Sequence, residues 1–191
     1  ILVGSTGFSA GYLALNKFTQ LGNAPINLNF TGTSTYARFA YNSLIGGDLN
    51  ITTPSVFFDG ATFSGSVSCL KTGGNNDNST GGNIFQGIST FTNSGSGQLL
   101  FGNVNPDTWN SDVTFSNLGT HYIYLCWNST GNIFNGNISL NSSVSALGIQ
   151  FCSGAAATAT ISAGNAISTG SYNGGYLILQ RITQLGTAPN N

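Results

Sequence analysis

An apolar residue opens a turn-and-strand unit that recurs along the middle of the chain. These lead residues are Ile45, Phe63, Phe85, Trp109 and Phe134, and they follow one another at intervals of 18, 22, 24 and 25 positions. Two positions after each lead stands Gly or Ser, and the segment that follows alternates polar and apolar side chains. Six positions after each lead comes a residue suited to burial, namely Ile51, Cys69, Phe91, Phe115 and Leu140.

A period of this length, made of short strands and Gly- or Asn-rich turns, is typical of one coil of a β-solenoid. Each coil should advance about 4.8 Å, so the lead residues should form one vertical stack. Asn83, Asp107 and Asn132 stand two positions before a lead, where we expect left-handed turns. The sequence therefore predicts an all-β parallel β-helix or β-solenoid with short coils. An all-β sandwich also has short strands but does not explain the joint recurrence of lead and turn.

A second set of strands can be aligned by a uniform offset of 25 positions. This offset gives one column of Leu99, Tyr124 and Ile149 and another of Phe101, Cys126 and Phe151. Because side chains alternate along a strand, both columns should face the core. We then expect an outward apolar row that contacts a partner or a covering segment, formed by Ile123, Leu125 and Trp127.

A longer repeat encloses the short one. Residues 11–25 (GYLALNKFTQLGNAP) and 175–189 (GYLILQRITQLGTAP) are identical at ten of 15 positions, and the second copy is numbered 164 higher than the first (175 − 11). We interpret residues 1–191 as one continuous solenoid segment that holds one 164-residue repeat and the start of the next. Residues 1–4 resemble the middle of a strand rather than a signal peptide, so we expect a longer parent protein.

Composition narrows the possible partners. Charged residues make up 5% of the chain, and the formal net charge is −1. Nucleic acids and anionic membranes attract clustered Lys and Arg, so we expect neither as a partner. No apolar run is long enough to insert across a bilayer. The chain has 27 Gly and no Glu or Met, a composition that favours strands and tight turns over helices.

The aspartates offer no evident catalytic pair. Asp48 and Asp112 occupy the same position of coils that should lie about 14 Å apart, too far for two cooperating carboxylates. Asp107 and Asp112 flank Trp109, but no base stands near them in the aligned register. The loop of residues 73–80 holds a single carboxylate, that of Asp77, which is too few for a calcium site.

Cysteine and histidine offer no evident site either. Cys69, Cys126 and Cys152 include no CxxC pair, and their odd number argues against a disulfide framework. His121, the one histidine, stands at a turn without an acid to orient it. We therefore predict no catalytic residue, no metal and no cofactor, and expect that the protein is not an enzyme.

Several motifs resemble the giant tandem-repeat β-solenoid surface adhesins of Bacteroidota, which include gliding-motility adhesins. These motifs are GNIF-x-G at residues 82–87 and 131–136, FTNSGSG at 91–97 and KTGGNNDNSTGGN at 71–83. The resemblance implies an extracellular filament at the bacterial cell surface that serves attachment or motility, with no catalytic residues to carry over.

We therefore expect a non-catalytic structural repeat of a surface filament or adhesin stalk. Its partners should be neighbouring repeats of the same or identical chains, and surface glycans are a further candidate. The alternative is a carbohydrate-binding or carbohydrate-active β-helix, which requires clustered acids or exposed aromatic rings. An ice-binding solenoid requires a flat array of threonines, and Thr90, Thr92, Thr108 and Thr114 fall in no constant column of the predicted register.

Overall fold

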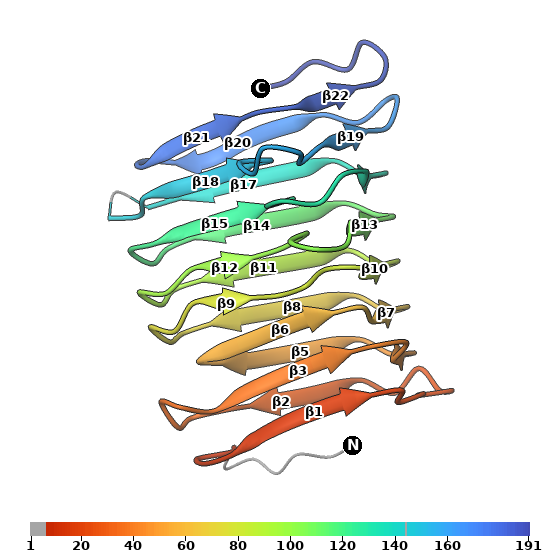
Figure 1. Ribbon diagram of the computed structural model, residues 1–191, viewed down its shortest axis with the longest axis vertical. Coiled ribbons are helices and arrows are strands. Elements are labelled where there is room, and N and C mark those ends of the chain that lie inside the picture. Colours follow the sequence, from red (N-terminus) through yellow and green to blue (C-terminus); the bar gives the residue numbers. More distant parts are fainter. Residues whose placement is uncertain (1–6, 144) are drawn as a thin grey trace.

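The chain folds as a parallel β-solenoid whose coils stack along one axis (Figure 1). The computed structural model describes residues 7–143 and 145–191, and within these ranges it contains strands and no helix. About seven turns are stacked, which confirms the all-β solenoid predicted from the sequence. The strand expected at residues 1–4 lies outside the described residues.

The strands of the described residues form three faces, and all pair in parallel with counterparts in neighbouring coils. The first face contains β2 (Ile26–Asn29), β5 (Leu49–Thr53), β8 (Val67–Lys71), β11 (Ser89–Asn93), β14 (Val113–Asn117), β17 (Ile138–Ser142) and β20 (Ile167–Tyr172). The second contains β4 (Leu44–Ile45), β7 (Thr62–Phe63), β10 (Ile84–Phe85), β13 (Thr108–Trp109), β16 (Asn132–Phe134), β19 (Ala159–Ile161) and β22 (Ile182–Gln184). The third begins with β1 (Tyr12–Asn16), β3 (Tyr36–Ala40) and β6 (Ser55–Asp59), and continues with β9 (Asp77–Asn78), β12 (Leu99–Leu100), β15 (Tyr122–Leu125), β18 (Gly148–Phe151) and β21 (Tyr176–Leu179).

The lead residues lie one above another in the second face. Neighbours in this column are partners in register, in the order Ile45, Phe63, Phe85, Trp109 and Phe134. All of them are 0% exposed. The four rings are stacked, with successive centroids 5.0, 5.6 and 4.4 Å apart. This column is an aromatic core that runs along the rod.

A second inward column faces the first across the core. It lies in the first face and consists of Ile51, Cys69, Phe91, Phe115 and Leu140, each in register with the next. The ring of Phe91 meets that of Phe85 edge to face at 5.2 Å, and Phe115 meets Trp109 in the same way at 6.0 Å. The two apolar positions of each turn-and-strand unit therefore pack against each other.

The third face departs from the predicted register. Leu99 pairs with Ile123, and Ile123 pairs with Ile149, so the first step spans 24 positions and the second spans 26. The uniform offset predicted from the sequence lies between these values and is wrong for both steps. Tyr124 therefore lies beside Leu100 and Gln150, not in the column of Leu99. Because a shift of one residue exchanges the two sides of a strand, every side chain of β15 points opposite to the prediction.

A buried polar ladder lines the corner before the second face. Asn83 Oδ1 accepts hydrogen bonds from two backbone N–H groups of the preceding coil, at 3.0 Å each. Asp107 Oδ1 accepts from the backbone N–H of Asn83 at 2.8 Å, and the backbone N–H of Asp107 donates to Asn132 Oδ1 at 2.8 Å. The prediction of left-handed backbone at Asn83, Asp107 and Asn132 is wrong. The preceding Gly82 and Gly131 take that conformation, with φ of 83° and 84°, because glycine adopts it without strain.

The two copies of the long repeat share features of their local conformation. Lys17 and Arg181, which occupy equivalent positions, have left-handed φ angles of 54° and 48°. Gln20 and Gln184 each donate a side-chain hydrogen bond to the carbonyl oxygen four residues later, at 2.6 and 2.9 Å. The second copy therefore repeats the backbone and side-chain features of the first at these positions.

Candidate functional site

The third face is interrupted between β6 and β9. Here side chains replace the backbone ladder, because the N–H groups of Val56 and Phe58 donate to Asp77 Oδ2 and Ser79 Oγ, at 3.0 Å each. Pro54 alone connects β5 to β6, whereas five residues, 72–76, connect β8 to β9. The short corner leaves space between the coils on either side of it.

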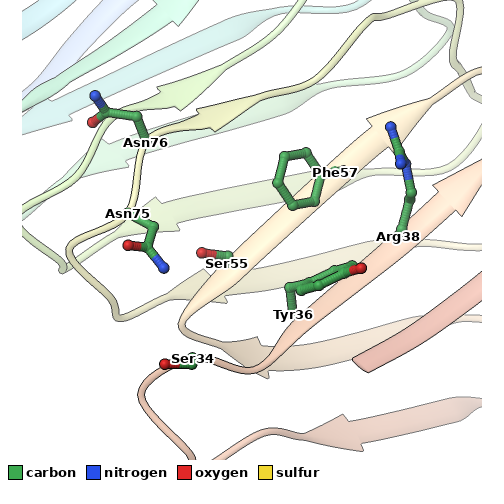
Figure 2. A pocket seen from close by; sticks show the side chains of 7 residues that line it. All are labelled: Ser34, Tyr36, Arg38, Ser55, Phe57, Asn75 and Asn76. Carbon is green, nitrogen blue, oxygen red and sulfur yellow. The ribbon is translucent and has the colours of Figure 1, made fainter. Parts of the chain in front are cut away.

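A groove of about 500 Å³ opens on the third face at this interruption (Figure 2). Three consecutive coils line it, with Ser34, Tyr36, Arg38, Ser55, Phe57 and Asn75 among the lining residues. A second hollow of about 480 Å³ lies around the same corner and includes Pro54 and Gly73 in its lining. The groove thus arises where successive coils differ in length.

Aromatic rings form the apolar part of the groove. Figure 2 shows the Phe57 ring face on and the Tyr36 ring nearly edge on. The two rings meet at 86°, with centroids 5.5 Å apart. The other side of Tyr36 stacks on Tyr12, with centroids 4.7 Å apart and an interplanar angle of 2°. Phe57 therefore provides a platform and Tyr36 a wall.

Polar groups surround the Phe57 ring. Arg38 lies over the Phe57 ring, 5.5 Å from its centroid, and its Nε donates to Asp59 Oδ2 at 2.6 Å. Asp59 is buried, so this ion pair neutralises both charges beside the groove. Ser34 and Asn75 are exposed and present hydroxyl and amide groups to the same space. The groove combines an apolar surface with neutral hydrogen-bonding groups.

A second aromatic cluster lies on the third face farther along the rod. The rings of Tyr122 and Tyr124 lie 5.3 Å apart, and Trp127 meets Tyr124 at 4.5 Å and 68°. His121 lies near Tyr124, and its Nδ1 accepts a hydrogen bond from the backbone N–H of Tyr122 at 2.9 Å. Sequence analysis missed both aromatic clusters, because their outward orientation follows from the register of the third face.

The outward apolar row predicted for β15 is wrong. Ile123 and Leu125 are each 0% exposed and belong to the core, whereas Trp127 follows the strand and is half-buried. The reason is the step from Leu99 to Ile123, one position shorter than predicted, which turns these side chains inward. Tyr124, which we expected inside, takes an outward position together with Tyr122.

The aspartates considered for catalysis bind backbone groups. Asp107 is fully buried, and its Oδ2 accepts a hydrogen bond from the backbone N–H of Gly102 at 2.7 Å. Burial raises the pKa of Asp107 to about 7, although its hydrogen bonds oppose that shift. Asp48 and Asp112 each accept a backbone N–H of the following coil at 2.8 Å, from Ser66 and Asn137. These contacts give each carboxylate a role in holding consecutive coils together.

Asp77 lies inside the rod, not in a solvated loop. Its Oδ2 lies 4.0 Å from Lys71 Nζ, and both side chains are 0% exposed. Burial raises the pKa of Asp77 to about 7, and the nearby Lys71 opposes the shift. Lys71 Nζ also donates to the Gly73 carbonyl at 2.7 Å. This buried pair lies beside the interruption of the third face.

Two threonines considered for ice binding do share a column. Thr90 pairs with Thr114 in the first face, whereas Thr92 pairs with Ser116, so the four threonines share no single column, as expected. The column of Thr90 and Thr114 continues with Ser139 and Ser168 on one side and Ser68 and Asn50 on the other. Thr108 lies in another face between Ile84 and Ile133. A regular threonine array is therefore not formed by these residues.

In the described ranges no three His, Cys, Asp or Glu residues lie together as a metal site would require. Those ranges also contain no helix able to cross a membrane. Comparisons with protein-family models, with curated proteins and with solved structures found no match to this chain. The interpretation of its function therefore rests on its own residues.

Proposed function

We propose that the chain is a non-catalytic structural repeat of a long extracellular filament or adhesin stalk. The observation that carries this proposal is the equivalence of residues 11–25 and 175–189, which share ten of 15 residues, the left-handed φ of Lys17 and Arg181, and the side-chain hydrogen bond of Gln20 and Gln184. In the first copy, the edge of β1 pairs with β3. The matching edge of β21 is therefore suited to a strand like β3 from a following repeat.

The chain after the second copy already follows the path of the first. Asn190 and Asn191 correspond to Ile26 and Asn27, with which β2 begins in the first face. Ile167 N donates to Asn190 Oδ1 at 2.9 Å, and Asn191 N donates to the Ile167 carbonyl at 3.0 Å. A further repeat can thus continue the first face without a change of register.

The side-chain columns suit a load-carrying rod. Each coil contributes apolar rings to a continuous core and backbone groups to long parallel ladders, so each coil stabilises its neighbours. A charged fraction of 5% avoids rows of like charges at the strand spacing. These properties support the proposed partners, which are neighbouring repeats of the same or identical chains, with no nucleic acid and no membrane insertion.

The motif resemblance extends the proposal to the giant adhesins of Bacteroidota. In that setting the rod would carry an attachment surface away from the cell, and in gliding cells it would transmit motion. The proposal is tested in the source organism with antibodies raised against this chain. Labelling of intact cells, together with weaker attachment when the number of repeats in the parent gene is reduced, is expected. Labelling only after cell lysis, or unchanged attachment of the shortened form, would contradict it.

Carbohydrate binding is a second candidate, and the groove at Phe57 favours it. An accessible ring face can stack on the apolar face of a pyranose, while serine, asparagine and arginine groups bond its hydroxyls. The Arg38–Asp59 pair leaves the groove without net charge, which suits a neutral sugar rather than an anionic one. We therefore add the binding of neutral surface glycans as a function of this face.

The glycan proposal is tested by screening neutral oligosaccharides on an array and titrating those that bind by calorimetry. Phe57→Ala should reduce affinity at least about tenfold, as expected for loss of a stacking surface. Tyr122→Ala, in the other aromatic cluster, serves as the matched control and should leave this affinity unchanged. Binding that survives Phe57→Ala, or an array without any bound neutral glycan, would refute the assignment.

A further inference from the structure

Cys126 and Cys152 lie next to each other in consecutive coils, at the corner that follows the third face. Leu125 pairs with Phe151, and Cys152 N donates a hydrogen bond to the Leu125 carbonyl at 2.9 Å. The two cysteines that follow these partners are therefore direct neighbours. Both have left-handed φ angles, 56° and 51°, and both are 0% exposed. Their side chains enter the same part of the interior.

The side chains of Cys126 and Cys152 are close enough for each to shift the pKa of the other. Neighbouring strands lie about 4.8 Å apart, within the roughly 4.4–6.8 Å that separates the Cα atoms of disulfide-bonded cysteines. Cys69 lies in β8 of the first face, between Ile51 and Phe91, and is a buried apolar residue of the core. The geometry thus singles out two of the three cysteines as a pair.

Cys126 and Cys152 have unequal surroundings. The Arg181 guanidinium donates to the carbonyl oxygens of Cys152 and Gly154, and its Nε donates to that of Ala157 at 3.0 Å. The side chain of Cys126 and the charge of Arg181 lower the pKa of Cys152, against the effect of its burial. Burial raises the pKa of Cys126. Cys152 is therefore the stronger nucleophile of the pair.

We propose that Cys126 and Cys152 are a redox-modification site that forms a disulfide between consecutive coils when the chain meets a small-molecule disulfide. The Cys152 thiolate attacks one sulfur of oxidised glutathione, and one glutathione leaves as its thiolate. Cys126 then attacks the Cys152 sulfur of the mixed disulfide, and its proton passes to the second departing glutathione. Two protein thiols are oxidised, and one glutathione disulfide is reduced to two thiols. The site does not depend on the proposed surface role.

The test compares reduced protein with protein incubated in oxidised glutathione, with remaining thiols alkylated after denaturation. Peptide mapping should show a link between Cys126 and Cys152, while Cys69 is alkylated. Because both sulfurs are buried, a second sample refolds the denatured, reduced chain in a glutathione redox buffer, in which access does not limit reaction. The same link is expected there. In the chain-entropy model, the link should raise the melting temperature by roughly 5–10 °C.

Matched variants separate the pair from general oxidation. Cys69→Ser should keep both the link and the melting shift, whereas Cys126→Ser should lose both and retain a stable glutathione adduct at Cys152. Three alkylated cysteines in both samples would overturn the proposal. A link that includes Cys69, or one that joins two chains, would overturn it as well.

Discussion

Trp109 lies flat on Phe134, with ring centroids 4.4 Å apart and an interplanar angle of 1°. The two residues occupy the same place in consecutive coils. Phe85 stacks on the other face of Trp109 at 5.6 Å. The indole is thus enclosed by rings from the coils on both sides, and it links three coils through the core.

Removal of this indole should destabilise the rod. Trp109→Ala is expected to lower the free energy of unfolding by about 3–5 kcal/mol, because it leaves a large cavity between two rings. Thr108→Ala, one residue away on the outer side of the same strand, should change it by less than about 0.5 kcal/mol. Chemical denaturation followed by circular dichroism measures both. Equal losses for the two variants would show that the column is not the core.

A glycine column at the corner after the first face should not tolerate a side chain. A Cβ atom on Gly119 would overlap the Gly95 carbonyl oxygen, and one on Gly95 would overlap that of Gly73. Gly119→Ala should therefore destabilise the protein by about 2–3 kcal/mol or more, since backbone must move. Gly22→Ala meets no atom within 4 Å and serves as the control. Equal melting temperatures for the Gly119→Ala and Gly22→Ala variants would contradict this packing.

Asp107 should make stability depend on pH. Its pKa is raised from 3.8 to about 7 by burial, so between these values the folded state binds more protons than the unfolded state. Stability should therefore fall as pH rises from about 4 to 7, and the contribution of Asp107 should be constant above that range. Asp107→Asn should reduce this slope and leave the part that the buried Asp77 contributes, whereas the exposed Asp112→Asn should leave the slope intact. Denaturation midpoints measured from pH 4 to 8 decide between these outcomes.

The ion pair beside the groove should contribute measurably to folding. Asp59 is buried, and its Oδ1 accepts from the Thr80 N–H at 2.6 Å, so removal of Arg38 leaves the carboxylate without its cation. Arg38→Ala should cost about 1.5–3 kcal/mol. In an Asp59→Asn background the same change should cost less, with a coupling energy above about 0.5 kcal/mol in a double-mutant cycle. Additive losses would show that the pair is not coupled.

Much of the fold could be predicted because one short unit keeps its chemistry from coil to coil. The lead column and the column six residues later required only an alternating strand and a constant place for the turn. The register of the third face could not be obtained in this way, since its strands are reached through corners of different length. An error of one residue there placed Tyr124 inside the rod and Ile123 outside it, so the outward-facing tyrosines were not predicted.

The groove also could not be predicted from the sequence. It depends on the contrast between Pro54, which alone connects β5 to β6, and the five residues that connect β8 to β9. Corner length could have drawn attention to this coil, because the step from Ile45 to Phe63 is the shortest in the lead column. The partial exposure of Phe57 and the closeness of Arg38 follow from three-dimensional packing.

Small-angle X-ray scattering of a two-repeat protein tests the central claim most directly. Residues 1–189 joined to residues 26–191 use the shared motif once at the junction and preserve the 164-residue offset. If the second copy continues the coils of the first, the maximum dimension should grow by about 34 Å, or about seven strand spacings, with an unchanged cross-section. A wider cross-section, or the profile of two separate bodies on a flexible link, would contradict the account.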